Sequence, residues 1–196
     1  MGHYFSQDDK GAHDVISVDL SIDGHVLSFD TDAGVFSKGK LDRGTAILID
    51  ALPPMEDKSV LDLGCGWGAI GIVIAKRHPG ARVHLSDVNP RAVAIAKKNA
   101  RKNDVDVMVH RSDILEAIDE TFDVIVTNPP IRAGKDVVYA MVKQSHEHLA
   151  AGGAFYAVVR SKQGAKSFSA EVERVFGNVA IIARGAGYKV FEAVRR

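Results

Sequence analysis

The most informative segment of this chain is Asp62-Leu63-Gly64-Cys65-Gly66-Trp67-Gly68. It follows the short apolar run Ser59-Val60-Leu61. A glycine-rich segment directly after a β-type run is typical of the loop between a buried parallel strand and the next helix. Further along, Asn128-Pro129-Pro130 follows a second such run at residues 122–127. Both segments are therefore expected at the carboxyl edge of one open sheet, where α/β proteins bind ligands.

Strand-like and helix-like segments alternate on both sides of these motifs. Strands are expected at 60–63, 82–86, 105–109, 122–127 and 153–160, and helices at 41–52, 69–77, 90–102, 136–149 and 165–176. Residues 179–183 and 188–194 are expected to form a C-terminal hairpin around Gly185-Ala186-Gly187, which makes one strand antiparallel. The pattern predicts an α/β fold with a doubly wound, mostly parallel, seven-stranded sheet and helices on both faces.

The N-terminal part has a different pattern. Residues 15–20 and 25–31 read as two strands around an Asp23-Gly24 step that suits a hairpin turn. We expect a single domain over 1–196, in which residues 1–40 form a β-hairpin extension and residues 41–196 form the cofactor-binding and catalytic core.

Composition limits the classes of function. The chain has 196 residues, 46% of them hydrophobic, and its 25 Lys and Arg balance its 25 Asp and Glu. Such a balance gives no global attraction to nucleic acid or membrane, so either partner would need a local patch. One cysteine, no apolar run near the ~20 residues that span a bilayer and no signal peptide predict a cytoplasmic protein without a membrane partner.

The glycine loop predicts a nucleoside cofactor. Glycines let the backbone turn sharply and approach a ligand closely, and the segment from Gly66 to Gly71 also matches the dinucleotide pattern G-x-G-x-x-G. A nicotinamide site is thus one interpretation. Asp62 argues against it, because a carboxylate at this point repels a pyrophosphate and attracts an ammonium group. The residues expected at this part of the site are Asp62, Gly64, Cys65, Gly66 and Gly68.

Acidic residues after the next two strands complete the expected cofactor site. Asp87, beside Val88, can accept hydrogen bonds from both ribose hydroxyls, because a carboxylate has two acceptor oxygens. The alternative use, capping the helix that begins at Pro90, suits Asn89 better. Ser112 and Asp113 are expected near an adenine edge, although an Asp there could also cap a turn.

The Asn-Pro-Pro segment predicts transfer of a group to nitrogen. The Asn128 side-chain oxygen and the Pro129 carbonyl can accept hydrogen bonds from an amine and orient its lone pair, while Pro129 and Pro130 keep the loop rigid. The alternative is a turn that only ends a strand. No motif resembles a metal site, because His146 and His148 point to different faces of the expected helix.

Three basic groups are expected to form a rim for phosphates around the site. The alternative is that each is an ordinary solvated face. The groups are Lys38, Lys40 and Arg43, then Arg132 and Lys135, then Lys162 and Lys166.

The glycine loop, Asp87, Ser112-Asp113 and Asn128-Pro129-Pro130 together closely resemble class I methyltransferases that use S-adenosylmethionine. Residues 128–135, with residues 34–37 and 40–45 before them and residues 187–190 after them, resemble single-domain relatives of ribosomal RNA small subunit methyltransferase C. The resemblance implies a Rossmann-like methyltransferase fold, S-adenosylmethionine as cofactor, and methylation of a guanine exocyclic amine. The implied partner is ribosomal RNA or the small ribosomal subunit, bound by a monomer or a homodimer.

Related amine methyltransferases often have an aromatic residue after Asn-Pro-Pro, where this chain has Ile131. Stacking on a base would then come from Phe36 or Tyr4. The substrate-binding residues expected from the resemblance are Phe36, Lys38, Arg43, Ile131, Arg132 and Lys135. Two alternatives stay open: a protein glutamine N-methyltransferase, which shares the Asn-Pro-Pro requirement, and a NAD-binding oxidoreductase or nucleotide-binding module.

Overall fold

The computed structural model describes residues 15–32 and 41–196, in which seven strands form one sheet in the order β5-β4-β3-β6-β7-β9-β8. The predictions for Tyr4, Phe36, Lys38 and Lys40 lie outside the described residues. The strands are β3 (Ser59–Leu63), β4 (Arg82–Asp87), β5 (Met108–Arg111), β6 (Phe122–Thr127), β7 (Leu149–Arg160), β8 (Ala180–Gly185) and β9 (Tyr188–Val194). Neighbours from β5 to β7 run parallel, whereas β9 is antiparallel to both β7 and β8. The predicted fold class is confirmed.

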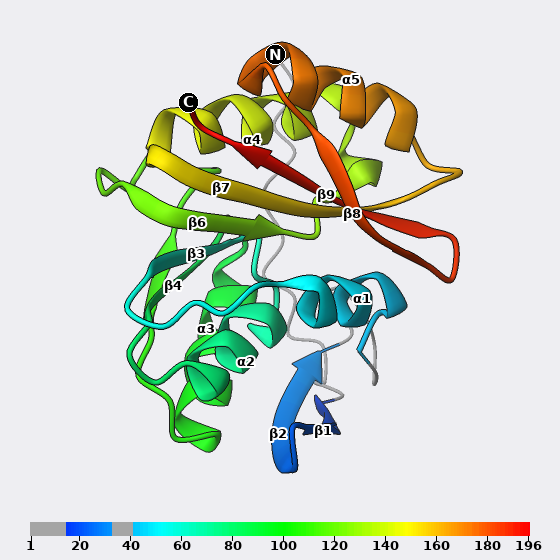
Figure 1. Ribbon diagram of the computed structural model, residues 1–196. Helices are drawn as coiled ribbons and strands as arrows, with labels where there is room; N and C mark the ends of the chain where they lie inside the picture. Colours follow the sequence, from blue (N-terminus) through cyan, green and yellow to red (C-terminus); the bar gives the residue numbers. More distant parts are fainter. Residues whose placement is uncertain (1–14, 33–40) are drawn as a thin grey trace, which may run out of the picture.

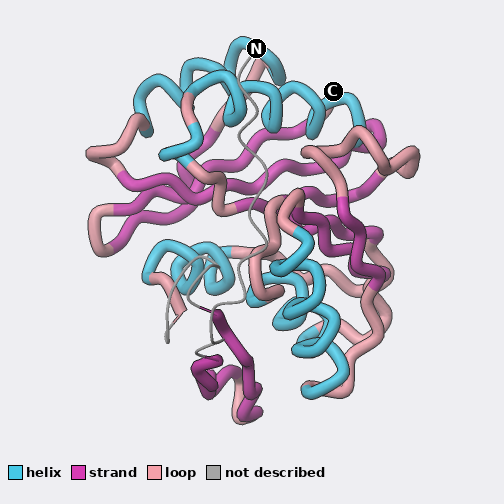
Figure 2. Tube along the Cα trace, turned by 180° about the vertical axis from the view of Figure 1, so that it is seen from behind, coloured by secondary structure: helices cyan, strands magenta, loops and turns pink. Residues whose placement is uncertain are grey.

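Helices cover both faces of this sheet (Figure 1). On one face lie α1 (Arg43–Ala51), α2 (Ala69–Arg77) and α3 (Pro90–Lys102), and on the other lie α4 (Lys135–His148) and α5 (Ala165–Phe176). The view from behind in Figure 2 shows the same two layers. Within β3, Val60 belongs to the core on the α2 side, and Leu61 and Leu63 to the core on the α4 and α5 side.

The strand order reverses between β3 and β6. From β3 the chain continues outward to β4 and β5, whereas β6 and β7 lie on the other side of β3. The loops that leave two such strands diverge onto opposite faces and leave a crevice between them, which is the usual ligand site of an open α/β sheet. The glycine loop follows β3 and the Asn-Pro-Pro loop follows β6, so both motifs lie where such a sheet is expected to bind its ligand.

Several element boundaries differ from those predicted. β5 begins at Met108 instead of 105, because the N–H of Val105 bonds to Ala100 at the end of α3 and not to the sheet. β7 begins at Leu149 instead of 153, because Leu149 already pairs with Phe122 before a bulge shifts the register. A 3₁₀ turn, η1 (Ile131–Ala133), follows the prolines where no element was predicted.

The N-terminal hairpin is β1 (Val15–Ile22) and β2 (His25–Asp32). Its turn residues Asp23 and Gly24 both have positive φ, as a two-residue hairpin turn requires, so the predicted turn is confirmed. Leu27 and Phe29 are buried on the face of β2 that meets the core.

Two asparagines of α3 bind the backbone of β2 as a neighbouring strand would. The Asn103 amide bonds to both the N–H and the carbonyl of Ser28, at 2.9 Å each. The Asn99 amide bonds to the N–H and the carbonyl of Asp30, at 2.8 and 2.9 Å. The spacing fits because four helical residues and two strand residues cover about the same 6 to 7 Å.

Asn99 also links the hairpin to the glycine loop. Its amide nitrogen donates to the Trp67 carbonyl at 2.8 Å, and the Trp67 ring packs edge-on against Phe29 with centroids 4.9 Å apart. The hairpin therefore supports the loop after β3. No helix of residues 15–32 and 41–196 is long and apolar enough to cross a bilayer.

Asn99→Ala should destabilise the protein by roughly 2 to 4 kcal/mol, because it removes the side-chain hydrogen bonds to three backbone groups of Asp30 and Trp67. Lys97→Ala, on the exposed face of the same helix, should change stability by less than about 0.5 kcal/mol. Urea denaturation followed by circular dichroism measures both. Equal stabilities of the two variants would contradict the role given to Asn99.

Candidate active site

Asp62 is fully buried at the end of β3 and binds the start of α2. Its Oδ2 accepts the N–H of Gly71 at 2.9 Å, in the first turn of a helix whose N-cap, Gly68, has no side chain to offer. Its Oδ1 is buried and has no hydrogen-bond partner among the described residues. Burial raises the pKa of Asp62 to about 7; the charge of Asp87 adds to this, and the Gly71 N–H opposes it. The unbonded oxygen therefore needs a proton or a cationic donor.

Gly71 lets α2 lie close enough for this bond. A Cβ added at Gly71 would lie 2.7 Å from Leu85 Cδ1 in β4 and 3.3 Å from Asp62 Cβ, closer than side chains tolerate. The third glycine of the G-x-G-x-x-G pattern is thus explained by helix packing against the sheet.

Four N–H groups of the glycine loop bond within the protein. Those of Gly64 and Cys65 donate to the Ser86 carbonyl, at 2.8 and 2.9 Å, and that of Gly68 donates to Cys65. The N–H of Gly66 donates to Asp87 Oδ2 at 2.9 Å. A loop that binds a pyrophosphate instead directs such groups at the ligand. This loop is therefore not a phosphate cradle.

Asp87 has a structural role that the sequence did not reveal. Besides the Gly66 bond, its Oδ1 accepts the N–H of Asn89 at 2.9 Å. Each carboxylate oxygen can accept a second bond, so ribose hydroxyls can still bind there. Asn89 caps α3 through the Arg91 N–H, as predicted, and Val88 is exposed beside Asp87.

The turn after β5 lies next to Asp87, because the Ser112 N–H donates to the Asp87 carbonyl at 3.2 Å. The Ser112 side chain is buried and accepts the Ala117 N–H at 3.0 Å, whereas Asp113 is exposed.

Burial raises the pKa of the Cys65 thiol well above its usual value, which agrees with a space-filling role in the glycine loop.

Asn128 is held in one orientation by side chains that the sequence analysis had not singled out. Its Nδ2 donates to Thr45 Oγ1 at 2.9 Å and lies 3.4 Å from Asp42 Oδ2. An ionised carboxylate only accepts hydrogen bonds, so the amide nitrogen must face Asp42 and the amide oxygen must point away from it. Asp42 also accepts from the Tyr188 hydroxyl, at 3.2 Å.

The rest of the Asn-Pro-Pro segment is partly engaged. The Pro129 carbonyl, predicted to accept from an amine, already accepts the N–H of Ile131 at 2.9 Å. Pro130 is exposed and precedes η1. Ile131 packs against the core beneath α4 and α5. Asn128 is therefore the main side-chain acceptor that this loop offers.

The residues of the predicted basic rim that lie in the described part of the chain are all exposed. The described members are Arg43 at the start of α1, Arg132 in η1, Lys135 at the start of α4, Lys162 after β7 and Lys166 in α5. Arg132 and Lys135 follow β6, Lys162 and Lys166 follow β7, and Arg43 begins α1, which packs against β7.

Among the described residues, no group of three His, Cys, Asp or Glu residues could hold a metal ion.

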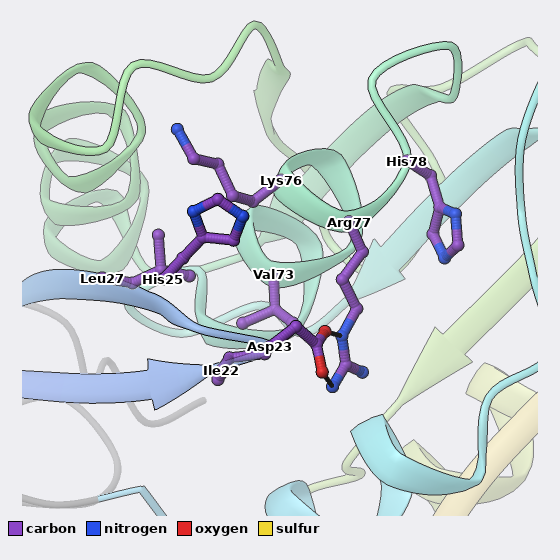
Figure 3. A pocket seen from close by; sticks show the side chains of 8 residues that line it. All are labelled: Ile22, Asp23, His25, Leu27, Val73, Lys76, Arg77 and His78. Carbon is purple, nitrogen blue, oxygen red and sulfur yellow. Dashed lines mark hydrogen bonds and ion pairs between the residues drawn. The ribbon is translucent and has the colours of Figure 1, made fainter.

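A cavity of about 280 Å³ lies elsewhere, between the N-terminal hairpin and α2 (Figure 3). Arg77 bonds to Asp23 of the hairpin turn across it, and the Lys76 ammonium bonds to the Asn103 carbonyl. Arg77 thus holds the hairpin turn, and Lys76 links α2 to the end of α3. Neither the glycine loop nor the Asn-Pro-Pro loop lines this cavity, so it is separate from the candidate active site.

Asp62→Asn should change how stability depends on pH. The pKa of Asp62 rises from 3.8 to about 7 on folding, so the folded protein binds more protons than the unfolded chain between these pH values. The free energy of unfolding of the protein therefore falls as the pH increases through this range. The free energy of unfolding of the parent, minus that of Asp62→Asn, should fall by about 1 kcal/mol per unit between pH 5 and 7. Urea titrations at four pH values measure this difference, which parallel curves would contradict.

The comparisons with known proteins agree with this geometry. Residues 26–192 match the methyltransferase small domain family. The chain is 37% identical to the uncharacterized Bacillus subtilis protein YbxB, over 97% of both chains. It is 35% identical to ribosomal RNA small subunit methyltransferase C of Pseudomonas entomophila, over 83% of this chain and 49% of that protein.

Among solved structures, the chain resembles the T. thermophilus 16S rRNA N2 methyltransferase in complex with AdoMet and guanosine. The TM-score is 0.84 with 30% identity, over 93% of this chain and 51% of that one. The chain thus spans about half the length of these ribosomal RNA methyltransferases. It belongs to the methyltransferase small domain family, and the prediction of an S-adenosylmethionine-dependent methyltransferase is confirmed.

Proposed function

We propose that this methyltransferase modifies the exocyclic amine of a guanine in ribosomal RNA of the small subunit. The observation that carries the proposal is the fixed orientation of the Asn128 amide, whose oxygen is directed away from Asp42 and left to accept from a substrate amine. A hydrogen-bond acceptor at this point helps only a substrate nitrogen that carries hydrogens, because a methyl-accepting atom without hydrogens cannot donate to the Asn128 oxygen.

The residues on the glycine-loop side fit the cofactor. Asp62 Oδ1, buried and unbonded, would accept the ammonium of the methionine moiety, and Asp87 would bind the ribose hydroxyls with its remaining lone pairs. Ser112 and Asp113, beside Asp87, would lie at the adenine edge. When bound, S-adenosylmethionine supplies a methyl group activated by the sulfonium charge.

Asn128 would then act on the acceptor. The lone pair of an aromatic amine is delocalised into the ring, which makes the amine a poor nucleophile. A hydrogen bond from the amine to the Asn128 oxygen would draw an amine hydrogen out of the ring plane, localise the lone pair on nitrogen for attack on the methyl group, and stabilise the positive charge that develops there. Because the Pro129 carbonyl already bonds to Ile131, it would make the weaker second contact.

Two findings support an RNA substrate. The Pseudomonas entomophila relative is named a ribosomal RNA small subunit methyltransferase, and the T. thermophilus 16S rRNA methyltransferase is in complex with guanosine. The exposed cations of the rim surround the same edge as Asn128, and phosphate contacts would position an RNA strand there without reading its sequence. Ile131 packs into the core, so base stacking would come from another residue.

The alternatives have less support. The loop N–H groups bond within the protein, and Asp62 is buried at the point where a dinucleotide pyrophosphate would pass, so a NAD-dependent oxidoreductase is not favoured. A glutamine N-methyltransferase would need the same Asn128, but a protein amide would not need the basic rim. The oligomeric state and the cytoplasmic location remain predictions.

The direct test is transfer of tritiated methyl groups to purified small and large ribosomal subunits and to naked ribosomal RNA, each from cells that lack this gene. Nucleoside analysis should find the label in N2-methylguanosine of small-subunit RNA. Label in another nucleoside, or only in protein glutamine, would overturn the proposed substrate.

Asn128→Ala should slow single-turnover methyl transfer by roughly 10² to 10³, which is the effect of losing one preorganised electrostatic partner. Affinity for S-adenosylhomocysteine, measured by calorimetry, should change little. The melting temperature with and without this ligand checks folding. A well-folded variant that methylates at the parent rate would return the loop to a structural role.

Replacing Arg132 and Lys135 by Gln should weaken RNA binding and flatten its salt dependence, because each lost phosphate contact removes close to one unit of slope for duplex RNA and less for single strands. The matched control replaces Lys97 and Arg101 by Gln, on the exposed face of α3. Fluorescence anisotropy at salt concentrations from about 50 to about 300 mM would measure the RNA affinity and its salt slope for both double variants, because phosphate contacts weaken over this range. Equal slopes would show that the rim does not bind phosphates.

A further inference from the structure

We propose that Thr45, Asp42 and Tyr188 are positioning residues that hold the Asn128 amide in its reactive orientation. They come from two segments, the start of α1 and the first residue of β9, and both are far in sequence from Asn128 in the loop after β6. The inference rests on the proposed function, because it gives these residues a role in amine methylation.

Asp42 would make the opposite orientation of the amide unfavourable, and the Thr45 hydroxyl would anchor the observed one. If the Asn128 amide were flipped, its oxygen would face the Asp42 carboxylate, and its NH₂ would face the substrate amine, donor against donor. In the observed orientation the nitrogen donates to Thr45 Oγ1, which is almost fully buried. Because the Thr45 hydroxyl is buried, water would not replace this hydrogen bond if the hydroxyl were removed.

Asp42 is itself held on both carboxylate oxygens. Its Oδ2 accepts the N–H groups of Gly44 and Thr45, at 2.9 and 3.2 Å, and so caps α1. Its Oδ1 accepts the Tyr188 hydroxyl. Capping the helix requires only the first set of bonds. The contacts to Asn128 and Tyr188 go beyond that need and tie the cap to the Asn-Pro-Pro loop.

Tyr188 reaches Asp42 by lying against Gly44. A Cβ added at Gly44 would lie 2.7 Å from two ring carbons of Tyr188, so only glycine at this position allows the ring to approach the start of α1. Burial raises the pKa of the Tyr188 hydroxyl and the charge of Asp42 adds to this, while Arg160 and Arg43 oppose it. The hydroxyl is therefore protonated at neutral pH and donates to Asp42.

The test compares Thr45→Val, which removes the hydroxyl but keeps the shape, with Thr45→Ser, which keeps the hydroxyl. Thr45→Val should slow single-turnover methyl transfer to small-subunit RNA on the order of tenfold, the value of a hydrogen bond worth about 1.4 kcal/mol. Thr45→Ser should stay within about twofold of the parent, and Tyr188→Phe should slow transfer by about threefold. Affinity for S-adenosylhomocysteine should be unchanged in all three.

Combination with Asn128→Ala separates positioning from general loosening of the fold. If Thr45 acts only through the amide, Thr45→Val should cause no further slowing in the Asn128→Ala background. Thr45→Val at the parent rate, or equal slowing in both backgrounds, would overturn the proposal.

A second measurement does not depend on activity. In ¹⁵N-labelled protein, the Asn128 side-chain NH₂ should show one slowly exchanging proton in the parent and in Thr45→Ser, and fast exchange of both in Thr45→Val. An amide that exchanges alike in all three overturns the proposal. If the parent transfers no methyl group but this pattern is found, the proposed function fails while the network that positions the amide stands.

Discussion

The carboxylate of Asp62, buried with one bonded and one unbonded oxygen, is the constraint on which the site depends. Its bond to Gly71 fixes where α2 begins, and that helix can lie so close only because Gly71 has no side chain to meet Leu85. The start of α2 in turn defines the path of the glycine loop, whose N–H groups bond to Ser86 and other groups of the protein. A site built in this way favours a cationic ligand over a phosphate.

The two halves of the site meet because the strand order reverses between β3 and β6. On one side, Asp62 and Asp87 offer carboxylate oxygens, which we propose accept the ammonium and ribose hydroxyl groups of the cofactor. On the other side, Asn128 offers an amide oxygen held by contacts with Thr45 and Asp42. Both sides are supported by elements distant in sequence: the N-terminal hairpin reaches the glycine loop through Asn99, and β9 reaches the Asn-Pro-Pro loop through Tyr188 and Asp42.

Much of this could be predicted from sequence, because it is encoded locally. Alternating apolar runs and glycines gave the order of strands and helices, and Asn89 before Pro90 is a local capping pattern that the structure confirms. The network around Asn128 could not be predicted in this way, since Asp42 and Tyr188 are distant in sequence and Asp42 reads locally as an ordinary helix cap. Asp87 was predicted only as a ligand acceptor, because a side chain that also binds loop N–H groups leaves no sequence pattern.

If Asp62 accepts the ammonium group of the cofactor, as we propose, cofactor binding below neutral pH must release a proton. With a pKa of about 7, Asp62 is mostly protonated at pH 6 in the free protein and must ionise to bind a cation. Calorimetric titration with S-adenosylhomocysteine at pH 6, in buffers of different ionisation enthalpy, should show release of close to one proton, and Asp62→Asn should abolish it. A binding enthalpy that is the same in every buffer for the parent protein would contradict the account.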